Sequence, residues 1–241
     1  MTDHYPEHVF LEKHRIGKLA QIREIIFGAQ DGLLVPLGVI SSVAGAFASN
    51  EIVIVAGISE ALAGAFSMAS GGYLSSQAEH QVYQTEIKKE RAAIKAHPQE
   101  EIEEMAMLFE EEGMPKERAS IMAKEMAEYP ELFANTMIQK ELGIDPEPAG
   151  GPIRDSVVIG FSYLCASLIP LVPYFFIEAR SAIPYSIVLT LLALFSLGVI
   201  KGRFASLSYV KSGLQILLVG TVSGIGGYLL GVTLPYILGI Q

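Results

Sequence analysis

Two acidic residues lie inside long apolar stretches, where a charged side chain is costly. Asp31 occurs in the run IIFGAQDGLLVPLGVI and Glu60 in the run VIVAGISEALAGAF. An ionisable group near the centre of a bilayer costs at least about 2.5–3.5 kcal/mol on insertion scales, so such residues usually face a water-filled path or a polar partner. Carboxylates placed in this way can take up a cation or a proton. The alternative interpretation is that each pairs with a backbone or hydroxyl donor and is purely structural.

Met68 follows Glu60 by a little over two helical turns. Its thioether is a soft ligand that suits late first-row metals, although a single methionine more often serves only for packing. Small residues between Gly64 and Gly72 would let another helix or a ligand come close to the backbone here.

Paired metal-ligand side chains also occur in an internal acidic segment. Glu101 and Glu104 are spaced i,i+3, and Met137 and Glu141 are spaced i,i+4, so each pair shares one face of a helix. Stacked carboxylates repel one another unless a cation or a proton lies between them. Considered alone, such pairs more often belong to a solvated acidic surface, and this alternative remains open.

Several enzyme and pump signatures are missing from the sequence. It has no Glu-x-x-His pair, which ferritin-like di-iron centres use, and no P-loop, GxSxG or HExxH motif. These absences disfavour a ferroxidase and an ATP-driven pump, and we expect no enzymatic activity.

The composition indicates a membrane protein with one charged segment. The chain is 51% hydrophobic and 18% charged, against about 25% charged residues in soluble domains, and its mean hydropathy is +0.40. The segment 79–147 holds 17 of the 26 acidic and 8 of the 17 basic residues, so it accounts for the whole net charge of −9. This balance suggests a cation partner and excludes nucleic acid, which needs a basic surface. Cys165 is the only cysteine, and its apolar neighbours predict that it is buried.

Helices that cross a membrane must position the residues above. Five apolar stretches occupy residues 25–48, 52–78, 153–177, 182–200 and 214–240. About 20 residues in a helix are enough to cross a bilayer, and helices are expected because lipid cannot satisfy backbone polar groups. The sequence therefore predicts an all-α polytopic membrane protein with five transmembrane helices.

Basic residues near the ends of these spans predict the orientation. The region before the first span and the loop between the fourth and fifth spans are enriched in lysine and arginine, whereas the other short loops hold only Arg180. By the positive-inside rule, the N-terminus, the acidic segment and the 201–211 loop are cytosolic. Five spans then place the C-terminus on the opposite side.

The acidic segment is predicted to form helices of its own. The second span has no helix breaker before His97-Pro98, so its helix should continue to Ala96. Pro98 suits the first position of a new helix, and later helix ends and starts are marked by Gly113, Pro115, Pro130 and Gly143. The predicted organisation is a cytosolic segment at 1–23, two spans at 24–78, an inserted acidic metal-binding domain at 79–148 and three spans at 149–241.

Four motifs in the chain resemble those of the vacuolar iron transporter family of plants, fungi and prokaryotes. They are REIIFGAQDGL at 23–33, GISEALAGAFSMASGGY at 57–73, KELG at 140–143 and LIPLVPY at 168–174. The resemblance extends over nearly the whole chain after residue 15. It implies a homodimer with five transmembrane helices and a cytosolic metal-binding domain, which exports Fe²⁺ from the cytosol by proton antiport. Related proteins transport manganese.

The resemblance also implies roles for individual residues. The positions that match the membrane pathway are Asp31, Glu60 and Met68, and those that match the cytosolic metal ligands are Glu90, Glu101, Glu104, Met137 and Glu141. The chain departs from the plant pattern at Ala93, where a glutamate is expected, and at Ile138, where a second methionine is expected. We therefore expect its cytosolic site to hold fewer ions or to bind them more weakly.

Two function classes other than an enzyme remain open on the sequence alone. The first is an iron transporter acting in iron homeostasis, with Fe²⁺ as cargo, Mn²⁺, Zn²⁺ and Co²⁺ as further candidate ions, and no resident cofactor. The second is a membrane-anchored protein that binds or sequesters metal without transport, although an anchor has no need of Asp31 and Glu60. The expected location is the plasma membrane in a prokaryote and the vacuolar membrane in a eukaryote.

Overall fold

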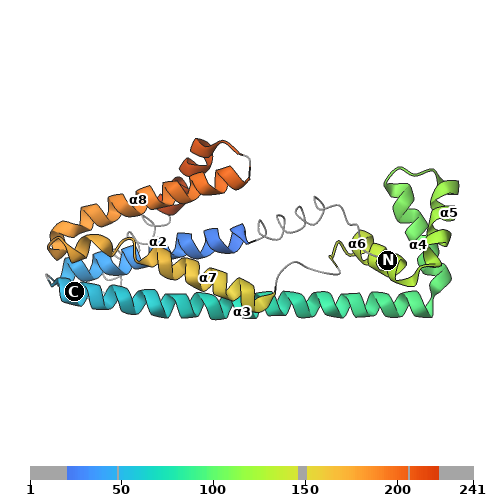
Figure 1. Ribbon diagram of the computed structural model, residues 1–241, viewed down its shortest axis with the longest axis horizontal. Coiled ribbons are helices and arrows are strands. Elements are labelled where there is room, and N and C mark those ends of the chain that lie inside the picture. The colour runs from blue at the N-terminus through green and yellow to red at the C-terminus, as the bar shows by residue number, and fades with distance from the viewer. Residues whose placement is uncertain (1–20, 48, 146–150, 206, 223–241) are drawn as a thin grey trace, which may run out of the picture. The chain divides into compact units, whose positions relative to one another are not determined.

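The structure is a computed structural model that describes residues 21–47, 49–145, 151–205 and 207–222. All regular elements within these ranges are helices (Figure 1). In chain order they are α2 (Ile22–Ala46), α3 (Asn50–Ala96), α4 (Pro98–Glu111), α5 (Lys116–Ala127), α6 (Pro130–Glu141), α7 (Pro152–Ser167), the 3₁₀ helix η1 (Val172–Phe175), α8 (Ala179–Phe204) and a last helix, Tyr209–Val222.

The chain divides into two compact units. One comprises Met1–Leu74 with Pro152–Gln241, and the other comprises Ser75–Gly151. We call them the membrane unit and the acidic unit. The α3 helix begins in the first and ends in the second, as the absence of a breaker before His97 predicted.

Three helices are long and apolar enough to cross a membrane: α2, α3 and α8. The predicted second and fourth spans lie within α3 and α8, and the predicted first span, 25–48, coincides with α2 up to Ala46. Of the predicted fifth span, only the part up to Val222 belongs to the described residues, in a shorter apolar helix. The prediction of five spans therefore remains untested, and most of the predicted 1–23 segment also lies outside the described residues.

The predicted third span is wrong in its extent. Residues 153–177 were expected to form one helix, but α7 ends at Ser167 and the chain continues through turns into η1. Pro170 and Pro173 lack the backbone N–H that a continuing helix needs. The Asn50 side chain supplies some of the missing hydrogen-bond donors. Its Nδ2 donates to the carbonyl oxygens of Tyr174 and Ile177 at 2.7 and 2.8 Å.

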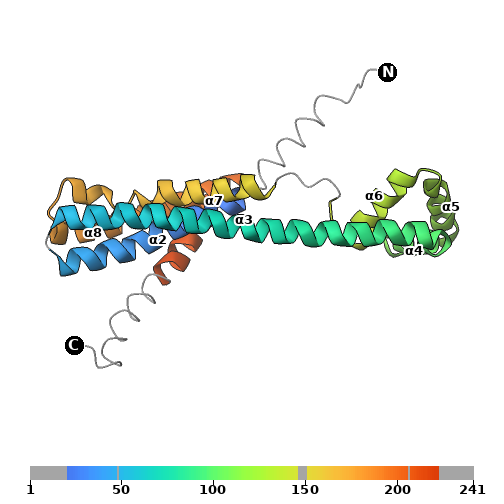
Figure 2. The same cartoon turned by 90° about the horizontal axis from the view of Figure 1, so that it is seen from below.

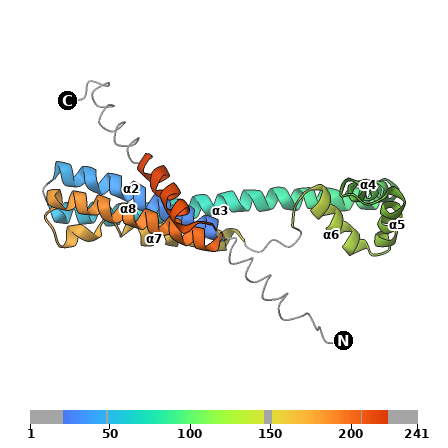
Figure 3. The same cartoon turned by 90° about the horizontal axis from the view of Figure 1, so that it is seen from above.

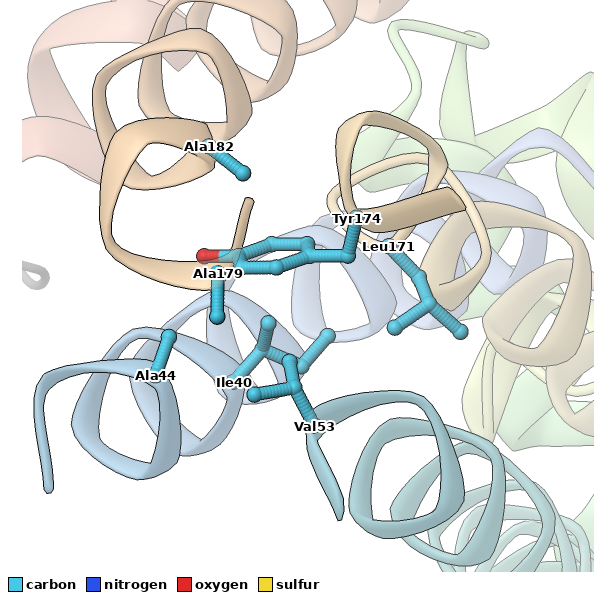
Figure 4. Close-up of a cluster of buried hydrophobic side chains, with 7 residues drawn as sticks. All are labelled: Ile40, Ala44, Val53, Leu171, Tyr174, Ala179 and Ala182. Atoms are coloured by element: carbon cyan, nitrogen blue, oxygen red, sulfur yellow. The ribbon is translucent and has the colours of Figure 1, made fainter. Parts of the chain in front are cut away.

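The membrane unit is held together by close backbone approaches and by apolar clusters. α7 runs beside α2 and α3 (Figures 1 and 2). The last helix packs against the C-terminal half of α8 (Figure 3), where a Cβ on Gly198 would lie 2.5 Å from the Ser212 carbonyl oxygen. Near the α2–α3 connection, the Tyr174 ring fills the centre of a buried cluster (Figure 4), which comprises Ile40, Ala44, Val53, Leu171, Tyr174, Ala179 and Ala182.

The acidic unit has its own apolar core, to which α4, α5 and α6 contribute. The buried residues of this core are Met105, Ala106, Phe109, Ala119, Ala123, Phe133 and Met137. Pro98 opens α4 and Pro130 opens α6, as predicted. Gly113 and Gly143 follow the ends of α4 and α6 with φ of 96° and 64°, left-handed values that favour glycine. The predicted helix boundaries in this segment are therefore confirmed to within two residues.

Candidate metal sites

Three glutamates from three helices of the acidic unit meet at one point. Glu90 lies on α3, Glu101 on the first turn of α4 and Glu141 at the end of α6. One carboxylate oxygen from each lies within 4.8 Å of the other two. The turn at His97-Pro98 contributes to this, because it changes the direction of the chain between Glu90 and Glu101 (Figure 1). We call these residues the carboxylate cluster.

Two of the three glutamates of the carboxylate cluster are buried, whereas Glu141 is exposed. Glu90 and Glu101 are each 8% exposed. Glu90 Oε1 and Glu101 Oε2 are buried and have no hydrogen-bond partner. In the described part of the chain, no basic side chain lies within 4.0 Å of the three carboxylates. A buried carboxylate without a partner is costly, so this arrangement favours a bound cation or proton.

Burial and mutual repulsion change the acidity of the cluster. Burial, with the charges of Glu141 and Glu101, raises the pKa of Glu90 to about 7. Burial and the charge of Glu104 also raise the pKa of Glu101 and of Glu141. Carboxylate oxygens are ligands for divalent cations such as Mn²⁺, and a metal must displace the protons that these groups retain.

The other predicted ligands of the acidic unit lie near the cluster but differ from it. Glu104 is half-buried on α4, and its charge acts on Glu90, Glu101 and Glu141. Met137 is fully buried in the apolar core, one turn before Glu141. Its thioether has a packing role there, and its role as a ligand remains a prediction.

In the membrane unit, Glu60 is bound by a hydroxyl donor from another helix. Tyr163 of α7 donates its OH to Glu60 Oε1 at 2.5 Å, while Glu60 Oε2 is buried without a partner. The hydroxyl pairing that the sequence left open is therefore present. It occupies one oxygen only, so the second remains available to a cation or a proton.

Small residues on α2 and α3 place Tyr163 between those helices. A Cβ on Gly32 would lie 2.4 Å from the Tyr163 carbonyl oxygen, and a Cβ on Gly64 would lie 2.4 Å from the Tyr163 ring. Asp31 is half-buried and immediately precedes Gly32. The predicted pathway carboxylates thus occur on the two helices that flank one tyrosine.

Two further predictions concern side chains of the membrane unit. Met68 is half-buried on α3, about 12 Å along the axis from Glu60 at 1.5 Å per residue, and its place in a pathway remains a prediction. Cys165, predicted to be buried, is exposed. It lies on the outer surface of α7, where apolar neighbours suit a lipid-facing position as well as a core.

Comparison with known proteins gives consistent matches over most of the chain. The sequence profile of the VIT family matches residues 22–232. Vacuolar iron transporter 1 of Eucalyptus grandis is 35% identical over 208 residues, covering 86% of this chain and 84% of the relative. Vacuolar iron transporter 1 of Arabidopsis thaliana is 32% identical over 231 residues, covering 95% and 90%. Protein CCC1 of Saccharomyces cerevisiae is 30% identical over 212 residues, covering 84% and 65%.

Proposed function

Because the chain belongs to the VIT family, which is one of membrane transporters and not of enzymes, we propose that it transports Fe²⁺ out of the cytosol. Mn²⁺ is the alternative cargo, and protons move in the opposite direction. The observation that carries the proposal is Glu60, whose carboxylate lies within an apolar helix with one oxygen buried and unpaired. The matching relatives are named as vacuolar iron transporters, which supports iron as the metal.

The acidic unit gathers the ion in this proposal. The carboxylate cluster offers three oxygens without a counter-ion, so a divalent cation can replace the protons that burial retains there. Glu104 adds negative charge beside the cluster. At neutral pH the cluster is therefore poised between a protonated form and a metal-bound form.

The membrane unit provides the path. A hydrated Fe²⁺ must exchange water for protein ligands, and the carboxylates of Asp31 and Glu60 attract it. The thioether of Met68 favours a softer ion over Mg²⁺ or Ca²⁺. The same carboxylates accept protons when the metal leaves, which couples the two fluxes in opposite directions.

The working form in this proposal is a homodimer in the bilayer. The N-terminus and the acidic unit face the cytosol, following the distribution of basic residues. The host membrane is the vacuolar membrane in a eukaryote and the plasma membrane in a prokaryote. The competing function is metal sequestration by an anchored protein. Sequestration would also use the carboxylate cluster, but it gives no role to Asp31 and Glu60 in the apolar helices.

Metal flux into proteoliposomes under an imposed pH gradient tests transport against sequestration. Wild-type protein should move Fe²⁺ and Mn²⁺ with the gradient, and Ca²⁺ poorly. Asp31→Asn keeps the size of the side chain but removes its charge, so it should abolish the flux while the purified protein remains folded. Wild-type rates in a well-folded Asp31→Asn protein would refute the proposed path and favour sequestration.

A further inference from the structure

Two of the basic residues that adjoin the carboxylate cluster in sequence, Arg91 and Lys140, are bound to side chains outside it. Arg91 follows Glu90 on α3. Its Nη1 lies 3.0 Å from Glu131 Oε2, and its Nη2 donates to Asn135 Oδ1 at 3.1 Å. Lys140 precedes Glu141 on α6, and its Nζ donates to both carboxylate oxygens of Glu112, at 2.5 and 2.6 Å. Lys140 Nζ also lies 5.1 Å from the centre of the Phe109 ring, within cation–π range.

These contacts attach α6 at two places. Glu131 and Asn135 are one turn apart near the start of α6, and Arg91 connects them to α3. Lys140 is the penultimate residue of α6, and it connects that end to Glu112 at the C-terminus of α4. One attachment alone would let a helix pivot, whereas two attachments to different helices restrict both its sliding and its rotation. Glu141 is the last residue of α6, so the second attachment acts directly beside it.

The cluster needs such attachments because its members repel one another once their protons have left and no metal is bound. Three carboxylates with oxygens within 4.8 Å would separate if α6 were free to move. A site that must be reassembled at each binding event binds more weakly than a preformed site. We propose that Arg91 and Lys140 are positioning residues that hold the carboxylate cluster together before the metal arrives. This inference rests on the proposed metal-binding role of the cluster.

The direction in which metal affinity changes distinguishes a positioning role from a simple effect of charge. Removing a positive charge near a cation site should strengthen cation binding, because repulsion is lost. Loss of a positioning contact should weaken it. Lys89 provides a matched control, since it also adjoins Glu90 but pairs with Glu86 on its own helix, at 2.8 Å.

Calorimetric titration of Mn²⁺ into the full-length protein in detergent tests the inference. Arg91→Gln and Lys140→Gln should each lower affinity about two- to fivefold, the size expected from losing one ion pair whose acidic partner is exposed. Lys89→Gln should leave affinity unchanged or slightly higher. The exchanged pair Arg91→Glu with Glu131→Arg should restore most of the loss. Unchanged or higher affinity in Arg91→Gln would overturn the proposal, as would failure of the exchanged pair to restore binding.

Three further variants keep the result interpretable. Asn135→Ala removes one contact of Arg91 without changing charge, so it should lower affinity about two- to fivefold even if Arg91→Gln folds poorly. Glu90→Gln and Glu101→Gln test the metal site itself. If these two leave Mn²⁺ affinity unchanged, the proposed site fails. If they weaken binding while the Arg91, Lys140 and Asn135 variants do not, only the positioning inference fails.

Discussion

At the scale of single residues, Glu90 shows how burial raises the affinity of a carboxylate for a proton. It is buried on α3 beside two other carboxylates, and one of its oxygens has no partner. Its pKa of about 7 means that protonated and ionised forms coexist near neutral pH. A small change in metal concentration or pH can therefore change the occupant of the cluster.

We predict that the acidic unit of the metal-free protein loses stability as the pH rises from about 4.5 to above 7. Over this range Glu90 keeps its proton in the folded state but loses it in the unfolded state, because its folded pKa is raised. The folded state then binds more protons, so the free energy of unfolding falls with rising pH. Thermal unfolding in detergent from pH 5 to 8 measures this.

Glu90→Gln is the control for that experiment, since it removes the titrating group. The unfolding temperature of Glu90→Gln should depend less on pH than that of the wild type, and the two should differ most above pH 7. Saturating Mn²⁺ should restore the unfolding temperature of the wild-type protein at high pH, because the metal replaces the lost proton. Parallel pH profiles in the two metal-free proteins would show that Glu90 does not titrate as described.

Tyr163 is the residue of the membrane unit whose role is most open to test. Tyr163→Phe keeps the ring between α2 and α3 but removes the donor to Glu60. Loss of a hydrogen bond to a charged group costs about 1.5–3 kcal/mol, and Glu60 would no longer be held in one orientation. We expect the rate of metal flux in proteoliposomes to fall severalfold, with Mn²⁺ binding by the acidic unit unchanged.

The exposed Tyr185 on α8 supplies the comparison, because Tyr185→Phe removes a hydroxyl from the same unit. That variant should transport like the wild type. Equal flux in the Tyr163→Phe and wild-type proteins would show that the hydroxyl is dispensable for the path.

At the scale of elements, helix contact in the membrane unit depends on glycine. We predict that Gly32→Ala destabilises the protein by about 1–3 kcal/mol, the usual cost of overpacking. The new Cβ would lie 2.4 Å from the Tyr163 carbonyl oxygen, so α7 must move away from α2. Gly38→Ala on the same helix meets nothing within 4 Å and should be neutral or slightly stabilising. Thermal unfolding of both variants in detergent checks this, and equal stability would contradict it.

The elements that the sequence predicted correctly depend on local chemistry. Pro98 begins a helix because its missing N–H and fixed φ suit the first position, and Gly143 follows a helix end because it tolerates positive φ. The third span was predicted too long because two prolines inside it were outweighed by its hydropathy. The capping of that break by Asn50 comes from 124 and 127 residues away and has no local signature.

The candidate sites were only partly predictable, because they also depend on contacts between residues that are far apart in the sequence. The spacing of Glu101 and Glu104 indicated a shared helix face, but the meeting of Glu90, Glu101 and Glu141 depends on how three helices pack. Glu90 was identified through the family resemblance and not through spacing. Tyr163 was missed, since its partner Glu60 is 103 residues away. The only local hint was a tyrosine within an apolar stretch.

At the scale of the whole molecule, carboxylates occur in two different settings, the acidic unit and the apolar helices of the membrane unit. The acidic unit holds its glutamates on α3, α4 and α6, beside an apolar core of its own. The membrane unit places Asp31 and Glu60 on its first two helices. Our proposal places the gathering of ions and their movement in different parts of the chain, so kinetics can separate the two roles.

We therefore predict that neutralising the cluster changes the concentration dependence of transport more than its maximal rate. Glu90→Gln combined with Glu101→Gln removes two of the three gathered carboxylates, so the KM for Mn²⁺ in proteoliposomes should rise about tenfold or more. The maximal rate should fall less than twofold, because Asp31, Glu60 and Tyr163 are unchanged. Asp31→Asn should show the reverse pattern, with flux lost at every concentration and Mn²⁺ binding by the acidic unit retained. If the double variant abolished flux even at saturating Mn²⁺, the cluster would be part of the path itself.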